Sequence, residues 1–206
     1  MPVQRGRNPA RRSRKIGKTQ GGRVQGGRAR EKWSHLFTDD IWTRLSEASG
    51  SLVVLRENPS RDFFHPCSGD EYLAVLDALP REISEPVRAI VLRRTSKLDE
   101  ALGVEARKRY SCLILNSFPK SLEMTWRHTP SEGARRHYDP WCTRWLQEER
   151  GWKLVWSIDE IRRYYLYHLL LHELGHLHQP WSNSTRIRES FAENFALEWA
   201  RRLGQL

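Results

Sequence analysis

A helix in the C-terminal part of the 206-residue chain constrains the fold more than any other feature. Ser157 and Glu160 form a capping-box pattern, in which each side chain satisfies a backbone N–H that the first helical turn leaves without a partner. Pro180 cannot continue a helix, so we expect the helix to end just before it. Residues 168–178 of this helix read HLLLHELGHLH, with four histidines and one glutamate.

The pentapeptide HELGH at 172–176 has the spacing of a metal site. Residues four apart share one face of a helix, so the imidazoles of His172 and His176 can reach the same ion. Glu173 follows the first histidine, where its carboxylate can accept a proton from a metal-bound water. We therefore predict that His172 and His176 bind Zn²⁺ and that Glu173 is the catalytic base. His168 is a candidate for the shell of groups that orient the ligands.

A catalytic zinc site needs a third protein ligand, and the sequence has no histidine after His178. A second helix is predicted over about 185–203, with Gly204 as its C-terminal cap. It contains Glu189 and Glu193, which are four apart and share one face. The spacing allows either carboxylate to be the third ligand, while the other holds the second nitrogen of a ligand histidine.

HELGH followed by ESFAENFA at 189–196 resembles the minimal gluzincin metallopeptidases, especially the ImmA/IrrE-type proteins. The resemblance covers roughly residues 150–203. It implies a zincin-like fold, a protein or peptide substrate, and Glu189 as the third zinc ligand. Glu193 occupies a position where the family often has Asp or Asn. The resemblance also implies that an edge strand above the metal pairs with an extended substrate backbone.

Apolar runs upstream of the histidine helix predict a small mixed sheet. Strands are predicted over 51–57, 87–94, 110–118, 122–128 and 153–157, and further helices over 39–49 and 68–80. We therefore expect one zincin-like α+β domain over 33–206. In this domain the sheet packs on the HExxH helix and on the C-terminal helix that carries the glutamates.

The positive charge of the chain is concentrated at its N-terminus. Residues 1–32 contain eleven of the 35 Lys and Arg residues and one of the 25 acidic residues, so residues 33–206 contain 24 of each. The segment 1–32 is rich in Gly, Arg and Gln and lacks hydrophobic periodicity, which predicts a disordered tail. Such a tail favours contact with nucleic acid or another polyanion, or it is a solvated segment without a specific partner.

Cysteine usage and hydropathy predict a cytoplasmic protein without a membrane partner. Cys67, Cys112 and Cys142 are odd in number and far apart, which argues against a disulfide framework and against a cysteine zinc site. No apolar run approaches the roughly 18 residues that a membrane helix needs, and the N-terminus has no apolar leader.

Two alternatives to a general zinc metallopeptidase stay open. One is a catalytically inactive zinc protein with a regulatory or binding role, and the other is a DNA-associated protease recruited by the basic tail. The sequence also offers several candidates for a group that stabilises the reaction's oxyanion, among which it does not choose. They are His128, His137, Tyr138 and Tyr164.

Overall fold

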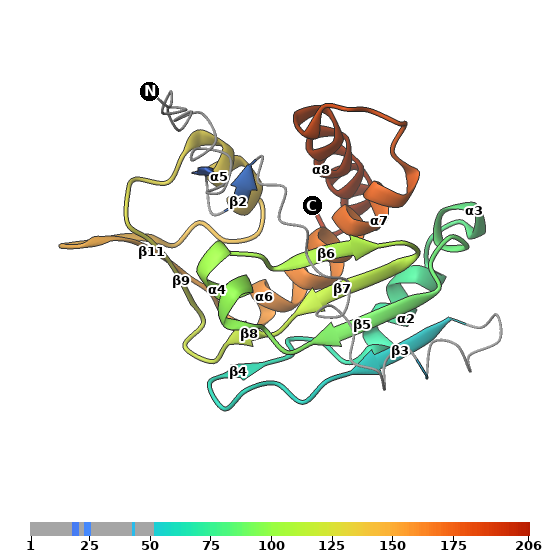
Figure 1. Ribbon diagram of the computed structural model, residues 1–206, viewed down its shortest axis with the longest axis horizontal. Coiled ribbons are helices and arrows are strands. Elements are labelled where there is room, and N and C mark those ends of the chain that lie inside the picture. The colour runs from blue at the N-terminus through green and yellow to red at the C-terminus, as the bar shows by residue number, and fades with distance from the viewer. Residues whose placement is uncertain (1–17, 21–22, 26–42, 44–51) are drawn as a thin grey trace, which may run out of the picture.

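A four-stranded mixed sheet lies at the centre of the fold (Figure 1). The computed structural model describes residues 18–20, 23–25, 43 and 52–206. The strands follow the order β3-β5-β7-β6; β3, β5 and β7 are parallel, and β6 is antiparallel to β7. Their bounds are β3 Val53–Arg56, β5 Ala89–Arg93, β6 Ala106–Arg109 and β7 Cys112–Asn116.

Side chains of the central strands alternate between two apolar layers. On β5, Ile90 and Leu92 belong to the main hydrophobic cluster, which includes residues of the helices, whereas Ala89 and Val91 belong to a second, smaller cluster. All four side chains are buried. A strand that is buried on both faces needs apolar residues at every position, which explains why β5 appears in the sequence as a continuous apolar run.

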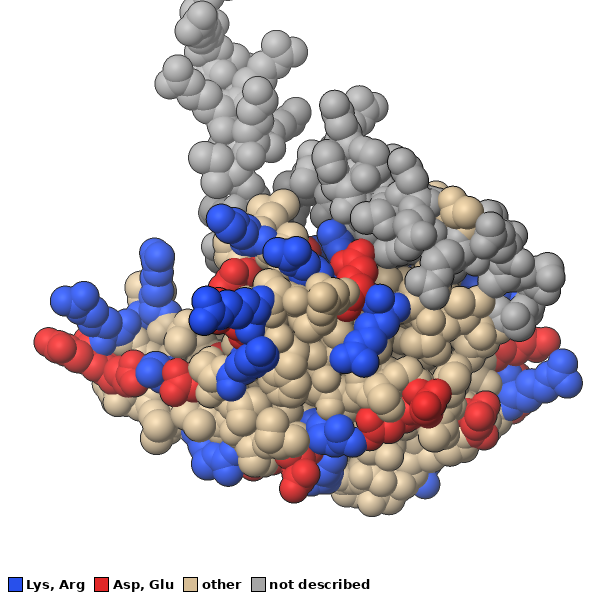
Figure 2. Space-filling model, turned by 90° about the horizontal axis from the view of Figure 1, so that it is seen from below, with Lys and Arg blue, Asp and Glu red and all other residues tan. Residues whose placement is uncertain are grey.

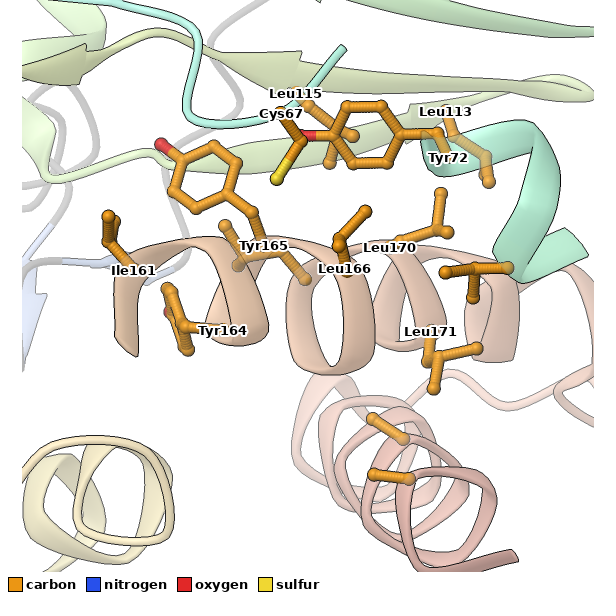
Figure 3. Packing of buried hydrophobic residues seen from close by; sticks show 14 of the residues in the cluster. Cys67, Tyr72, Leu113, Leu115, Ile161, Tyr164, Tyr165, Leu166, Leu170 and Leu171 are labelled. Carbon is orange, nitrogen blue, oxygen red and sulfur yellow. The ribbon is translucent and has the colours of Figure 1, made fainter. Parts of the chain in front are cut away.

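A long helix in three parts packs against the main layer of the sheet. It consists of α6 (Ile158–Tyr164), the π-helical turn η3 (Tyr165–Leu169) and α7 (Leu170–His178). The predicted capping box of Ser157 and Glu160 is present at its start. Figure 3 shows Tyr165 and Leu170 pointing toward Tyr72 of α2 (Gly69–Asp77), while Leu171 points to the opposite side of the helix.

The last helix, α8 (Thr185–Arg202), packs closely against α7. Ser184 caps its start through a hydrogen bond from the backbone N–H of Ile187. The close approach depends on Gly175, because a Cβ atom there would lie 3.0 Å from Cα of Ala192 and 3.1 Å from Cβ of Phe195. A glycine in α7 thus lets the backbone of α8 come within contact distance.

Smaller elements complete the described fold. A three-stranded antiparallel sheet has the order β10-β11-β9, and β4 pairs with β8. The bounds are β4 Phe63–Phe64, β8 Phe118–Pro119, β9 Glu123–Trp126, β10 Trp145–Glu148, β11 Gly151–Val155, α3 Arg81–Ser84, α4 Lys97–Leu102 and α5 Glu132–Tyr138. Small sheets and several helices confirm the predicted α+β class.

Each of the five predicted strands contains all or part of a strand in the structure, and the helix predicted over 68–80 contains α2. The strands predicted at 122–128 and 153–157 belong to the separate three-stranded sheet. The elements β4, β6, β10, α3, α4 and α5 lie outside the predicted ranges. The sequence of β6, ARKR, has three basic residues in four positions and so lacks the apolar alternation that indicates a strand.

The predicted basic tail, and with it any contact with nucleic acid, lies largely outside the described residues. Its described parts are β1 (Lys18–Gln20) and β2 (Arg23–Gln25), which pair antiparallel in a range where we expected no strands. The helix predicted over 39–49 also lies outside them, apart from Thr43. On the face drawn in Figure 2, Lys and Arg side chains are interspersed with Asp and Glu, consistent with equal numbers of bases and acids in 33–206.

Among the described residues, no helix combines the length and the apolar character needed to span a membrane.

The contact at Gly175 gives a first prediction. Gly175→Ala should lower the free energy of unfolding by about 1–3 kcal/mol, because the added methyl group needs the two helices to move apart. The measurement is urea denaturation followed by circular dichroism. The matched control is Gly133→Ala in α5, whose Cβ would meet only Ser131 Oγ at 3.8 Å. Equal stability of the two variants would contradict the close contact.

The three cysteines give a second prediction. All are buried and free, and burial raises the pKa of Cys67 to about 12 and also raises the pKa values of Cys112 and Cys142. Since the thiolate is the reactive form, iodoacetamide at pH 8 should leave the native protein unmodified and alkylate all three thiols after denaturation. Mass spectrometry measures the number of added groups. Rapid alkylation of the native protein would be inconsistent with this burial.

Candidate metal centre

Four aromatic side chains form a row along the three-part helix. They stand at four-residue intervals: Tyr164, His168, His172 and His176. In a regular α-helix such a row rotates by about 40° at each step. The π-helical turn takes more residues per turn and so counteracts this rotation between Tyr164 and His168, whose rings stack at 5.2 Å. The row therefore stays on one side of the helix, and its three histidines face Glu189 and Glu193 of α8.

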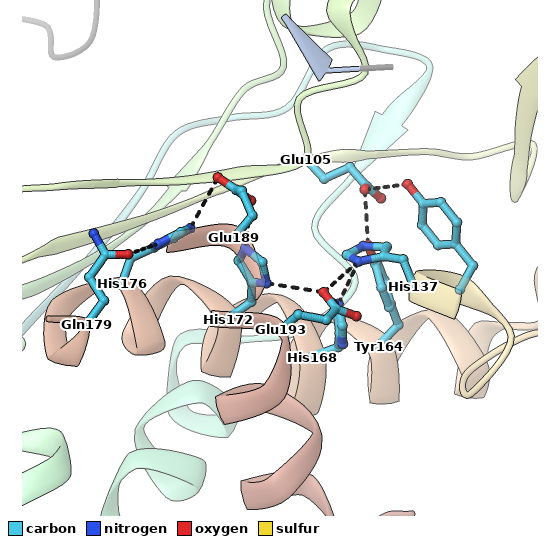
Figure 4. A network of polar contacts seen from close by, with 10 residues as sticks. Glu105, His137, Tyr164, His168, His172, His176, Gln179, Glu189 and Glu193 are labelled. Atoms are coloured by element: carbon cyan, nitrogen blue, oxygen red, sulfur yellow. Dashed lines mark hydrogen bonds and ion pairs between the residues drawn. The ribbon is translucent and has the colours of Figure 1, made fainter. Parts of the chain in front are cut away.

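Glu189 of α8 lies opposite the two histidines of the HExxH motif. Its Oε2 is 3.5 Å from Nε2 of His172, and its Oε1 is 3.8 Å from Nε2 of His176 (Figure 4). Each carboxylate oxygen thus faces one imidazole nitrogen, as in a set of ligands around a shared cation. The predicted residues His172, His176 and Glu189 are therefore brought together by the packing of α7 on α8.

The other nitrogen of each histidine also has a polar neighbour. Nδ1 of His176 donates to Oε1 of Gln179 at 2.9 Å, which leaves Nε2 with a lone pair on the side of Glu189. Nδ1 of His172 lies 3.5 Å from Oε2 of Glu193. Burial lowers the pKa of His176 and so favours the neutral imidazole, which is the form that binds metals.

Glu173 lies beside this pair of histidines. Ligand atoms of His172, Glu173 and His176 lie within 4.8 Å of one another, and Glu173 is only 6% exposed. His172 and His176 provide two oriented imidazole nitrogens, and Glu189 provides a carboxylate that faces both of them. Glu173 provides a second carboxylate beside the two histidines. This donor set fits a zinc ion with a neighbouring base.

The second pair of predicted residues, His168 and Glu193, lies on the far side of His172 from Glu189. Burial raises the pKa of Glu193, but hydrogen bonds with His137 and His172 outweigh this effect and hold the pKa well below its usual range. Glu193 is therefore a carboxylate surrounded by imidazoles. His168 is fully buried, and its Nε2 is 3.6 Å from Oε2 of Glu193.

Residues that the sequence alone could not place extend this polar network. His137, at the end of α5, lies 3.0 Å from Glu193 through Nδ1 and 2.8 Å from the Tyr164 hydroxyl through Nε2. The hydroxyls of Tyr138 and Tyr164 both donate to Oε2 of Glu105, at 2.8 and 3.0 Å (Figure 4). Three of the four residues considered as oxyanion stabilisers thus adjoin Glu193 or Glu105.

Two further histidines, His128 and His178, lie apart from the site. His128 is exposed, and His178 donates to the carbonyl of Ile83 and stacks on Phe195. Lys108 of β6, which no sequence signal indicated, donates to the backbone carbonyl of His176 at 3.1 Å. This contact ties the antiparallel strand at the end of the sheet order to the C-terminal end of α7.

Comparisons of the chain with protein-family models, with curated proteins and with solved structures gave no match.

The contact between Gln179 and His176 gives a third prediction. Gln179→Ala removes the acceptor that orients His176, and it should weaken zinc binding at this site by about 10-fold or more. Competition with a chromogenic chelator measures the affinity. Gln147→Ala, on the exposed strand β10, is the control and should bind zinc as the wild type does. Unchanged affinity in Gln179→Ala would argue against His176 as a ligand.

Proposed function

We propose that the chain is a zinc metallopeptidase of minimal gluzincin type with a zincin-like fold, in which His172, His176 and Glu189 bind the metal. The observation that carries the proposal is the placement of Glu189, whose two oxygens face the Nε2 atoms of the two histidines. If the two histidines had only a structural role, a carboxylate from a second helix would not need to face both of their Nε2 atoms.

Each residue of the site then has a defined task. Zinc, when bound, supplies a Lewis acid that polarises the scissile carbonyl and lowers the pKa of a water molecule. Glu173 accepts a proton from the attacking water and passes it to the nitrogen of the leaving amine. Gln179 and Glu193 hold the Nδ1 sides of the histidines so that both Nε2 atoms point to Glu189.

The position of β6 supports a peptide as the substrate. It is the last strand in the described sheet, antiparallel to β7, and Lys108 links it to the carbonyl of His176 at the site. An extended peptide that pairs with the outer edge of β6 would run past the histidines, and its backbone would be held by strand-type hydrogen bonds.

Substitution of the base provides the fourth prediction. Glu173→Gln should keep the metal content of the wild type and lose cleavage by about 10²-fold or more, because the amide cannot accept the proton of water. Cleavage is measured on a synthetic peptide library by mass spectrometry of the new termini. Glu198→Gln is the control, since Glu198 lies on the exposed side of α8 and pairs with Arg202.

The metal content of two further variants completes this test. His176→Ala and Glu189→Ala should each lose one equivalent of zinc. If wild type and Glu173→Gln cleave the library equally, Glu173 is not the base. If both leave the library intact while His176→Ala still loses zinc, the site binds metal in a protein without peptidase activity.

A further inference from the structure

A second group of metal-type ligands lies next to the proposed zinc site. It consists of His137 from the end of α5, His168 from η3 and Glu193 from α8, and ligand atoms of all three lie within 4.8 Å of one another. The three side chains are largely withdrawn from solvent, with exposed fractions of 10%, 0% and 18%. Three segments far apart in the sequence thus converge on one buried point.

The distances within this group match those around a single ion. His137 Nδ1 lies 3.0 Å from Glu193 Oε2 and 3.1 Å from His168 Nε2, and His168 Nε2 lies 3.6 Å from Glu193 Oε2. Ligands at the usual distance from a tetrahedral zinc ion are roughly 3.3 Å apart. The triangle is as compact as the one formed by Glu189 and its two histidines.

When the imidazole of His137 is neutral and donates Nε2–H to Tyr164, it has no proton on Nδ1 for Glu193, so a hydrogen bond from His137 to Glu193 needs a second proton on the ring. The Tyr164 hydroxyl donates to Glu105, so its oxygen accepts from Nε2–H of His137. A neutral imidazole that carries its proton on Nε2 has a lone pair on Nδ1. That lone pair faces the carboxylate of Glu193 at 3.0 Å. Either a second proton on His137 or a metal ion between the two groups resolves the repulsion.

The support behind His137 is typical of a metal ligand. Its Nε2–H is held by Tyr164, which is in turn held by the carboxylate of Glu105. Histidines that bind metals commonly donate their second N–H to such an oriented acceptor.

The carboxylate of Glu193 has a free oxygen. Oε1 is buried and has no hydrogen-bond partner within the part of the chain that the structure describes. Chelation by both oxygens, together with two imidazole nitrogens, would satisfy Oε1 and give an ion four protein donor atoms.

We propose that His137, His168 and Glu193 form a second metal site, which binds a divalent transition-metal ion such as Zn²⁺. Two imidazoles and a carboxylate are ligands that zinc accepts readily, and the burial of the site leaves it closed, as in structural zinc centres. The ion would join α5 and α8 to the three-part helix and fix Glu193 beside His172. The proposal concerns metal binding alone and does not depend on peptidase activity.

The test is the number of zinc ions that the full chain retains. The protein is loaded with zinc chloride, dialysed against metal-free buffer and analysed by inductively coupled plasma mass spectrometry. We expect two equivalents in the wild type and one in His137→Gln, because an amide keeps a hydrogen-bonding side chain but is a poor zinc ligand. His128→Gln, a change at an exposed histidine, is the control and should retain two.

The variants at the two sites separate this proposal from the peptidase proposal. His176→Ala should also retain one equivalent, and the double variant His137→Gln/His176→Ala none. If His137→Gln loses an ion while His176→Ala keeps the zinc content of the wild type, the second site is supported and the proposed zinc site at the HExxH motif is wrong. One equivalent in the wild type, unchanged in His137→Gln, would overturn the second site and assign the cluster to a protonated His137 paired with Glu193.

A titration of the wild type tests the second site without a variant, which could misfold. Addition of cobalt chloride to the metal-free chain should give two saturating steps in the visible absorption of the bound ion, one for each site. A single step at one equivalent would overturn the proposal without reference to any variant. Circular dichroism of His137→Gln shows whether a lost ion reflects a lost ligand or a lost fold.

Discussion

The close packing of α7 on α8 at Gly175 determines where the two glutamates of α8 lie relative to the histidine row. Because Gly175 has no side chain, Cα of Ala192 comes close to α7, and the flanking residues of α8 are carried toward the histidine row. Glu189 and Glu193, placed on either side of Ala192 along the helix, then face different nitrogens of the same row. A wider separation of the helices would move both carboxylates out of reach.

Burial forces the polar groups around these helices to pair with one another. A buried imidazole or carboxylate without a partner costs free energy, so the groups that converge here have to satisfy one another. Gln179 orients His176, Glu193 lies beside His172, and Glu105 receives two tyrosine hydroxyls. The candidate ligands are thus held in fixed orientations, which would reduce the reorganisation that binding of a metal requires.

Sequence patterns predicted the elements that depend on local interactions. The capping box at Ser157 set the start of the helix, and the four-residue spacing of His172 and His176 placed them on one face. Strands with continuous apolar runs were also found, because both of their faces are buried. β6 was missed since its basic sequence has no apolar face, and its place beside α7 depends on pairing with β7.

Other features became clear only in the folded chain. Spacing alone allowed either Glu189 or Glu193 as the third ligand, because residues four apart share a face whichever way the helix is turned, and only the resemblance to the gluzincins favoured Glu189. The depth and direction of the crossing of α7 and α8 decided that Glu189 faces both Nε2 atoms and Glu193 faces Nδ1 of His172. His137 was one of several candidates in the sequence, but it belongs to a helix more than thirty residues away, so no local pattern could place it beside Glu193 and His168. Local sequence determined the helices and the ligand types, whereas the packing of distant segments decided which atoms meet.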